Sequence, residues 1–156
     1  MSFTEARNYL ADRGYEDRIQ EFDISSATVE LAAIAVGTAP ERIAKSLTFM
    51  VDEHPVMILC AGDAKVHNAK YKSFFHKKAK MLTPDEVHNL IGHDIGGVCP
   101  FGIKDGVDVY LDNSLKRFDI VYPACGSANS AVSLNLDELE QLSASIDWID
   151  VCKLPE

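Results

Sequence analysis

Two long apolar runs follow one another in the first half of the chain, and they constrain its fold more than any other feature. The runs are KSLTFMVD (45–52) and PVMILCAG (55–62), with only Glu53 and His54 between them. A connection this short joins antiparallel strands, although the glycine that favours a tight turn is missing. The sequence therefore predicts a β-hairpin.

Helix signals occur on both sides of this hairpin. Thr83, Pro84 and Glu86 supply an N-cap, a first-turn proline and a capping-box acid, so a helix is predicted from there to about residue 91. Similar signals predict helical segments at 2–14, at 28–36, just after residue 38 and at 136–142.

Short runs of β-branched and aromatic residues predict further strands. They lie at 18–22, 106–111, 118–123, 131–136 and 147–151. The elements do not alternate strictly enough for a doubly wound parallel sheet. We therefore expect one α/β domain over residues 1–156, built on a mixed and strongly curved sheet.

The composition favours a cytoplasmic protein with reduced thiols. A chain of 156 residues buries one hydrophobic core without disulfides, and its cysteines form no CxxC pair. The N-terminal segment carries charges throughout, and no apolar run approaches the roughly 20 residues that span a bilayer. No membrane contact is expected.

The net charge of −9 argues against non-specific binding to a long nucleic acid. The segment from Lys65 to Lys80 nevertheless contains six lysines and no acid. It is either a solvated helix with Tyr71, Phe74 and Phe75 turned inward or a patch that contacts phosphates, and the two interpretations are compatible.

Lys45 is an unusual residue for its strand. Alternation places it on the apolar face with Leu47 and Phe49, opposite the face of Ser46 and Thr48. Its ammonium either reaches water beyond the strand edge or lies as a cation at the mouth of a pocket.

The longest glycine-rich segment is GHDIGGVCPFG, from Gly92 to Gly102. Gly96 and Gly97 free its backbone and Pro100 stiffens its exit. The segment is either a structural turn or a row of amides that stabilises charge on an ester oxygen. It lacks the GxGxxG and GK[ST] patterns, so no nucleotide cofactor is expected.

The loop PACGSANS (123–130) is a second polar segment, either a plain turn or a contact for a polar ligand. Cysteine catalysis through Cys99 or Cys125 would need a nearby histidine, and no Cys/His signature is present. A metal site built from His93, Cys99 and Cys125 matches no structural zinc spacing. We expect neither a cofactor nor a metal ion.

Three segments, ERIAKSLTF, GGVCPFG and FDIVYPACGSANSAVSLNLDELE, occur in this order over nearly the full chain. Together they resemble the YbaK/EbsC family and the editing domain inserted in bacterial prolyl-tRNA synthetases. The resemblance implies a compact α/β domain with a mixed, partly barrel-like sheet surrounded by helices. It also implies hydrolysis of the ester between a mischarged amino acid and the terminal adenosine of a tRNA.

The resemblance carries over residue by residue. Lys45 matches the family's essential lysine, and GGVCP matches its GxxxP loop, whose amides face the scissile carbonyl; this implies catalytic roles for Gly96, Gly97, Val98 and Cys99. The substrate-binding residues that it implies are Phe22, Thr28, Ser46, Pro100, Phe101, Cys125, Gly126, Ser127 and Asn129. PACGSANS has neither the basic, glycine-rich pattern of cysteine-specific members nor the histidine of alanine-specific ones, which leaves the amino acid open.

The resulting hypothesis is a trans-editing deacylase for a small, unspecified amino acid. The Gly96 to Cys99 backbone would stabilise the carbonyl oxygen, while Lys45 would hold a phosphate or ribose oxygen. The partner is the acceptor end of a mischarged tRNA, contacted through Lys65 to Lys80, with an aminoacyl-tRNA synthetase as a further partner. The alternative is a non-catalytic tRNA-binding or synthetase-associated module of the same fold.

Overall fold

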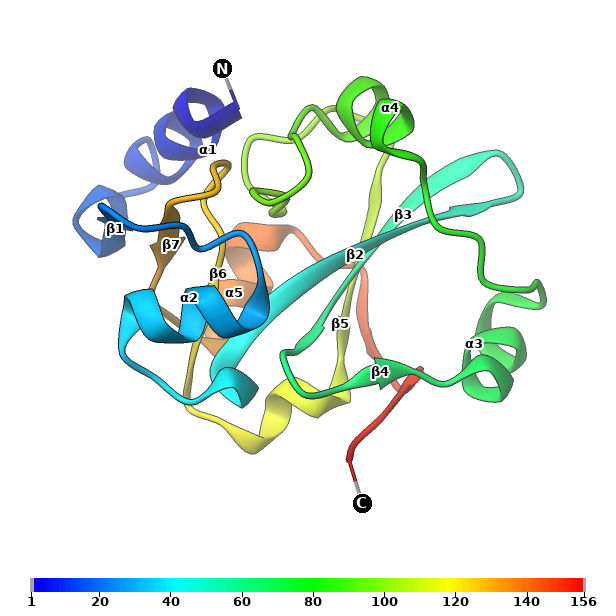
Figure 1. The fold of residues 1–156 in the computed structure, drawn as a ribbon. Coiled ribbons are helices and arrows are strands. Elements are labelled where there is room, and N and C mark those ends of the chain that lie inside the picture. Colours follow the sequence, from blue (N-terminus) through cyan, green and yellow to red (C-terminus); the bar gives the residue numbers. More distant parts are fainter. Residues whose placement is uncertain (1, 156) are drawn as a thin grey trace.

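The computed structural model describes residues 2–155 and is organised around a curled, mixed six-stranded sheet (Figure 1). Its strand order is β8-β6-β2-β3-β5-β9. β2 pairs antiparallel with β3, as β6 does with β8, and the remaining neighbours are parallel. The strands are β2 (Ile43–Val51), β3 (His54–Ala61), β5 (Asp108–Asp112), β6 (Ile120–Pro123), β8 (Leu134–Asn135) and β9 (Asp147–Ile149).

Two short strand pairs flank this sheet. β1 (Ile19–Glu21) pairs with β7 (Ser130–Val132), and β4 (Lys65–Val66) pairs with β10 (Cys152–Lys153). The predicted α/β class with a mixed, partly barrel-like sheet is confirmed. The strand predicted at 131–136 is split between β7 and β8, because its first half pairs with β1 and its second half with β6.

The predicted hairpin is confirmed as β2 and β3, whose register runs from Ala44↔Ala61 to Val51↔His54. Its turn consists of Asp52 and Glu53, whose φ angles are +50° and +64°. Two positive φ angles are what a two-residue turn between twisted strands requires, and glycine usually supplies them. His54, predicted as part of the connection, is the first residue of β3.

Helices surround the sheet, and those that begin after Thr28 and Thr83 start where the sequence predicted them. Thr28 caps α2 by accepting a hydrogen bond from the Leu31 amide at 3.2 Å, and Gly37 ends it with a φ of +85°. The α-helices are α1 (Ser2–Ala11), α2 (Val29–Val36), α3 (Asn68–Phe75), α4 (Pro84–Glu86) and α5 (Leu136–Ser143). Shorter helical segments are η1 (Glu16–Arg18), η2 (Pro40–Arg42), η3 (Val87–Ile91) and η4 (Asn113–Arg117).

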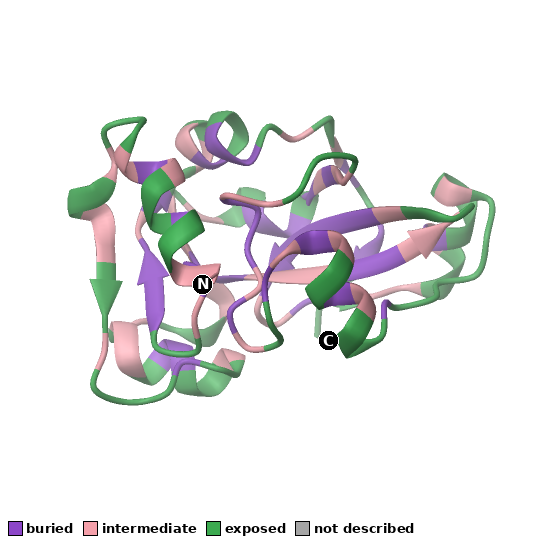
Figure 2. Ribbon diagram, turned by 90° about the horizontal axis from the view of Figure 1, so that it is seen from above, coloured by how far each residue is buried: buried purple, intermediate pink, exposed green. Residues whose placement is uncertain are grey.

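The core lies around the central hairpin, where the buried colouring of Figure 2 is concentrated. Met57, Ile58 and Leu59 of β3 are fully buried. α2 packs separately, through Ala32 and Ala33, against Ile43 at the start of β2. This contact places the N-terminus of α2 beside the strand that carries Lys45.

The basic segment is only partly helical, because α3 covers 68–75 and Lys77 to Lys80 follow it. Tyr71 is fully buried as predicted, whereas Phe74 is 42% exposed. Phe74 contacts the rings of Phe75 and Tyr110. The prediction that Phe74 turns inward is therefore wrong.

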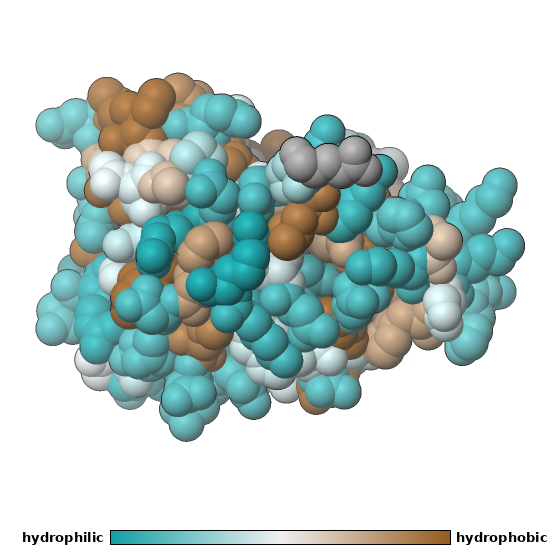
Figure 3. All heavy atoms as spheres, turned by 90° about the horizontal axis from the view of Figure 1, so that it is seen from below, coloured by the Kyte–Doolittle hydropathy of each residue, from teal (hydrophilic) through white to brown (hydrophobic). Residues whose placement is uncertain are grey.

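The face in Figure 3 is mostly hydrophilic, with a prominent apolar patch at its upper left and smaller apolar patches elsewhere. Leu31 and Ile34 are exposed apolar residues of α2. Within residues 2–155, no helix is long and apolar enough to cross a membrane.

We predict that Thr83→Ala lowers the free energy of unfolding by about 1 kcal/mol. Thr83 Oγ1 accepts from the Glu86 amide at 3.2 Å, and the Glu86 carboxylate accepts from the Thr83 amide at 2.9 Å. Urea denaturation measures the change. The exposed neighbour Asp85, changed to alanine, is the control, with an expected effect of about 0.5 kcal/mol or less; equal effects would contradict the cap.

Candidate functional site

The edge of β2 that faces β6 is only partly paired. β6 pairs with β2 at Ile43 and Ala44 alone, and farther along the Thr48 carbonyl accepts from the Leu82 amide at 3.1 Å. Within residues 2–155, no strand pairs with this edge between the two contacts. Alternate residues of a strand direct their backbone groups to the same edge, so the backbone amide and carbonyl of Ser46 face this gap.

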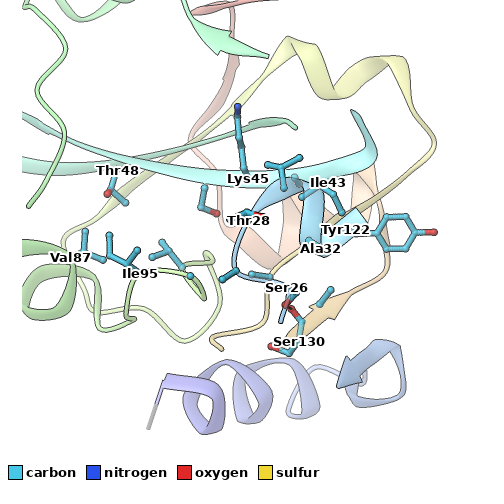
Figure 4. Close-up of a pocket in the computed structure, with 18 of the residues that line it drawn as sticks. Ser26, Thr28, Ala32, Ile43, Lys45, Thr48, Val87, Ile95, Tyr122 and Ser130 are labelled. Carbon is cyan, nitrogen blue, oxygen red and sulfur yellow. Dashed lines mark hydrogen bonds between the residues drawn. The ribbon is translucent and has the colours of Figure 1, made fainter. Parts of the chain in front are cut away.

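A cavity of about 200 Å³ lies at this gap (Figure 4). Its walls come from the start of α2, β2, the end of β6 and the two segments around residues 81–87 and 95–98. Most of its lining is apolar, including Val29, Ala32, Ile43, Leu82 and Val87. Serine and threonine hydroxyls add polar groups, from Ser26, Thr28, Ser46, Thr48 and Ser130. The arrangement is typical of a small-ligand site.

Lys45 lines this cavity, but its ammonium is directed to a neighbouring turn. Nζ lies 2.5 Å from the Ala64 carbonyl oxygen and 3.4 Å from that of Gly62. Figure 4 shows the Lys45 side chain leaving β2 on the side opposite to Thr48. An ammonium has three donors, and two of them are used here, so one is available to a ligand.

The turn that holds this ammonium is tightly fixed. A Cβ at Gly62 would lie 2.1 Å from the Pro40 carbonyl oxygen, so the backbone passes too close for a side chain. Arg117 pairs with Asp63 at 2.6 Å, and its hydrogen bond keeps the pKa of Asp63 below the usual value. The acceptors of Lys45 are therefore held in place from both sides.

The glycine-rich segment contributes a turn at the cavity wall. The Gly97 amide donates to the Asp94 carbonyl at 3.1 Å, and Gly96 has a φ of +97°, which favours glycine at that turn position. Gly96 and Val98 line the cavity. Within residues 2–155, their amides donate to no backbone acceptor, so they are free to bind a ligand oxygen.

Gly97 has a different role from Gly96. Its Cα approaches the second polar loop so closely that a Cβ would lie 2.5 Å from the Ser127 amide nitrogen. The structure therefore packs the two polar loops against each other through Gly97, which does not line the cavity.

The second loop supports the cavity wall from behind. Ser127 Oγ lies 2.6 Å from Ser130 Oγ, and Asn129 Nδ2 donates to the Phe22 carbonyl at 3.2 Å. The Gly126 carbonyl accepts from Ser2 Oγ at 2.6 Å. Phe22, Gly126, Ser127 and Asn129 thus hold one another without lining the cavity, whereas their neighbours Ala124, Ser130 and Ala131 reach it.

Four other residues implied by the resemblance lie in the protein interior. Cys99, Phe101 and Cys125 are fully buried, and Pro100 is also buried between them in the sequence. None of them lines the cavity. Of the residues implied by the resemblance, the cavity brings together Lys45, Ser46, Thr28, Gly96 and Val98.

The structure does bring Cys99 to a histidine, with Sγ 3.4 Å from His93 Nε2. Nε2 also lies 2.7 Å from the Phe101 carbonyl, which only accepts, so Nε2 carries the proton and cannot take one from the thiol. Burial raises the pKa of Cys99 and lowers the pKa of His93. The pair is therefore not an activated nucleophile. Within residues 2–155, no three His, Cys, Asp or Glu side chains form a metal site.

Several cavity residues were not predicted from the sequence, among them Ser26 and Thr48, whereas Ser130 belongs to the loop that was predicted as a contact for a polar ligand. Thr48 had a usable signal, because two hydroxyl residues at alternate positions of an apolar strand share one face. We instead took the opposite face of the strand, which carries Lys45, as the functional one. Ser26 and Ser130 are brought to the cavity by the pairing of β1 with β7, which local patterns do not reveal.

We predict that Gly97→Ala lowers the free energy of unfolding by about 1–3 kcal/mol, because the new methyl group would push the two loops apart. Thermal or urea unfolding measures this. Ile95→Ala is the control, since Ile95 is 65% exposed at the tip of the same loop. A Gly97→Ala protein as stable as this control would show that the loops do not pack as described.

A similar fold and related sequences occur in other proteins. A protein to which a trans-editing role for prolyl-tRNA synthetase has been ascribed superposes with a TM-score of 0.87 and 28% identity, over 97% of both chains. YwhH of Bacillus subtilis (strain 168), a protein without an assigned function, is 50% identical over 98% of both chains. The proline–tRNA ligase of Geobacillus sp. (strain WCH70) is 31% identical over 64% of this chain, which matches only 18% of that ligase.

The family relation rests on most of the chain. Residues 25–142 match the model of the aminoacyl-tRNA editing domain. This range contains every residue that lines the cavity. The resemblance to YbaK-like editing proteins is thereby confirmed: the chain belongs to the aminoacyl-tRNA editing domain family.

Proposed function

We propose that this chain is a hydrolase that removes a wrongly attached amino acid from a tRNA, acting in the cytoplasm, where tRNA is charged. One observation carries the proposal: a small, mostly apolar cavity opens beside the unpaired amides of Gly96 and Val98. Membership in the editing-domain family supplies the substrate class.

The chemistry needs positioning more than a protein nucleophile. Water attacks the ester carbonyl carbon, and negative charge develops on the carbonyl oxygen. Amides already fixed by the turn at Gly96 stabilise that charge without reorganisation. The bond to the ribose oxygen then breaks, and that oxygen takes up a proton, leaving a free amino acid and an uncharged tRNA.

Lys45 acts from the rim in this scheme. Its ammonium, held by the carbonyls of Gly62 and Ala64, has one remaining donor for a phosphate or ribose oxygen of the terminal adenosine. That contact would hold the ester carbonyl beside the amides, so that the free energy of binding orients the reacting groups.

We predict that Lys45→Ala lowers kcat/KM for deacylation about 10–100-fold, since a hydrogen bond to a charged group contributes about 1.5–3 kcal/mol. Release of labelled amino acid from a panel of mischarged tRNAs measures it. Lys104→Ala is the control, because Lys104 is an exposed lysine that donates to the Asn89 carbonyl outside the cavity. Unchanged activity in Lys45→Ala would rule out this role for Lys45.

In this proposal the basic segment would bind the acceptor end of the tRNA. It begins at Lys65, directly after the Ala64 carbonyl that holds Lys45, and Met81, directly after its end, lines the cavity. Lys70 and Lys77 are paired with acids, whereas Lys72 and Lys78 line a separate hollow. Within residues 2–155, Lys72 and Lys78 form no ion pair and are available to phosphates.

We predict that the double variant K72A/K78A weakens tRNA binding and lowers the slope of log affinity against log salt by about 2, one per lost phosphate contact. Fluorescence anisotropy across a salt series measures both. The control K70A/K77A removes the same charge from lysines already paired with Asp150 and Asp52. Equal slopes for the two variants would contradict a specific role for Lys72 and Lys78.

The second candidate is a non-catalytic tRNA-binding or synthetase-associated module. One observation favours it: the Lys45 ammonium is occupied by two carbonyls and leaves β2 on the side opposite to Thr48. Such a module would bind tRNA with strong salt dependence and release no amino acid from any tRNA in the panel. The deacylation assay thus separates the two functions.

A further inference from the structure

Two hydroxyl groups in the cavity have no hydrogen-bond partner. Ser46 Oγ is buried and unpaired, and Thr48, only 5% exposed, makes no side-chain hydrogen bond within residues 2–155. The other serine and threonine hydroxyls of the lining are engaged: Thr28 caps α2, Ser130 contacts Ser127, and Ser26 donates to the Ser130 carbonyl. The unpaired groups are therefore confined to one strand face.

The unpaired hydroxyls lie in apolar surroundings. Ser46 and Thr48 are two residues apart on β2, so they point to the same side. Figure 4 shows Thr48 on the same side of β2 as Val87 and Ile95. Ser46 Oγ is buried without a partner, which is costly, and native structures contain few such groups, often at functional positions. A ligand that supplies the missing hydrogen bonds would remove this cost.

We propose that Ser46 and Thr48 select the amino acid to be removed by hydrogen-bonding a hydroxyl group on its side chain. The inference rests on the proposed deacylation and names its substrate class: tRNA esters of small hydroxyl amino acids. Hydroxyls donate and accept, so the pair can satisfy a substrate hydroxyl in both directions.

The position of the pair favours the amino-acid side chain over other polar parts of the substrate. The ribose and phosphates belong to a polymer that is too large for a cavity of about 200 Å³. The α-ammonium carries a charge, and the cavity is lined by no Asp or Glu among the described residues. The cavity of about 200 Å³ is only somewhat larger than an engineered one of about 150 Å³ that binds benzene, so it suits a small side chain.

The test compares amino acids that differ only in the hydroxyl. One tRNA is charged with threonine or valine, and with serine or alanine, and kcat/KM for deacylation is measured for each ester. We expect the wild-type protein to prefer threonine over valine about 10–100-fold, because valine leaves both hydroxyls unpaired. The variants Ser46→Ala and Thr48→Val are expected to lose most of this preference.

Ser145→Ala is the matched control, because Ser145 Oγ is also buried and unpaired but lies outside the cavity. It should leave the threonine preference unchanged. Both Ser46→Ala and Ser145→Ala should raise the melting temperature of the free protein by about 2–4 °C, since each removes a buried unpaired hydroxyl. A lower melting temperature for Ser46→Ala would mean that its hydroxyl serves the fold, which overturns the inference.

Binding of non-hydrolysable analogues separates this inference from the proposed function. Calorimetry compares adenosine that carries threonine through a 3′-amide with its valine counterpart. A threonine preference that Ser46→Ala abolishes supports the inference, even if no ester is hydrolysed and the proposed deacylation fails. The inference is overturned if the wild-type protein binds the two analogues with equal affinity, or if Ser46→Ala weakens the binding of both equally. Neither result bears on deacylation, which the release of amino acid from tRNA tests separately.

Discussion

The partial pairing of β2 with β6 is the constraint on which the site depends. Two residue pairs join these strands before they separate, and the segment at Leu82 closes the edge again farther along. A fully paired strand would leave no room for a ligand between them. The cavity is therefore a consequence of how far the sheet curls, and α2 together with the Gly96 turn only completes its walls.

Reactive side chains are scarce around the cavity, and this shapes the chemistry that it can support. The thiol nearest to a histidine is buried away from the cavity and faces a protonated nitrogen. What remains is a set of backbone amides, hydroxyls and one ammonium. Groups of this kind can orient a ligand and stabilise negative charge on it, but they provide no nucleophile.

Much of the fold was predictable from the sequence, because local signals agreed with tertiary contacts. Thr28 and Gly37 mark the two ends of α2 as expected, and the apolar runs form the central hairpin. Strands of two residues, β4 and β10, have no pattern of their own and exist only through their pairing. The break between β7 and β8 at residue 133 was not predictable for the same reason, since one apolar run pairs with two different strands.

The site was predicted less completely than the fold. Strand alternation placed Lys45 correctly opposite Ser46 and Thr48, but sequence alone does not show which face meets a cavity. The resemblance led to Gly96 and Val98, and also to Cys99, Phe101 and Cys125, which the structure buries in the core. Motif matching identifies a segment, whereas the direction of each side chain depends on the packing of distant elements.

The carbonyl groups that hold Lys45 have one more consequence. They are neutral, so they fix the ammonium without cancelling its charge, as a carboxylate would; the nearby carboxylate of Asp63 is already bound to Arg117. A positive charge thus lies beside the strand that lines the cavity, in a protein whose net charge is −9. Polyanions repelled by the rest of the surface would find here a local minimum of electrostatic potential energy.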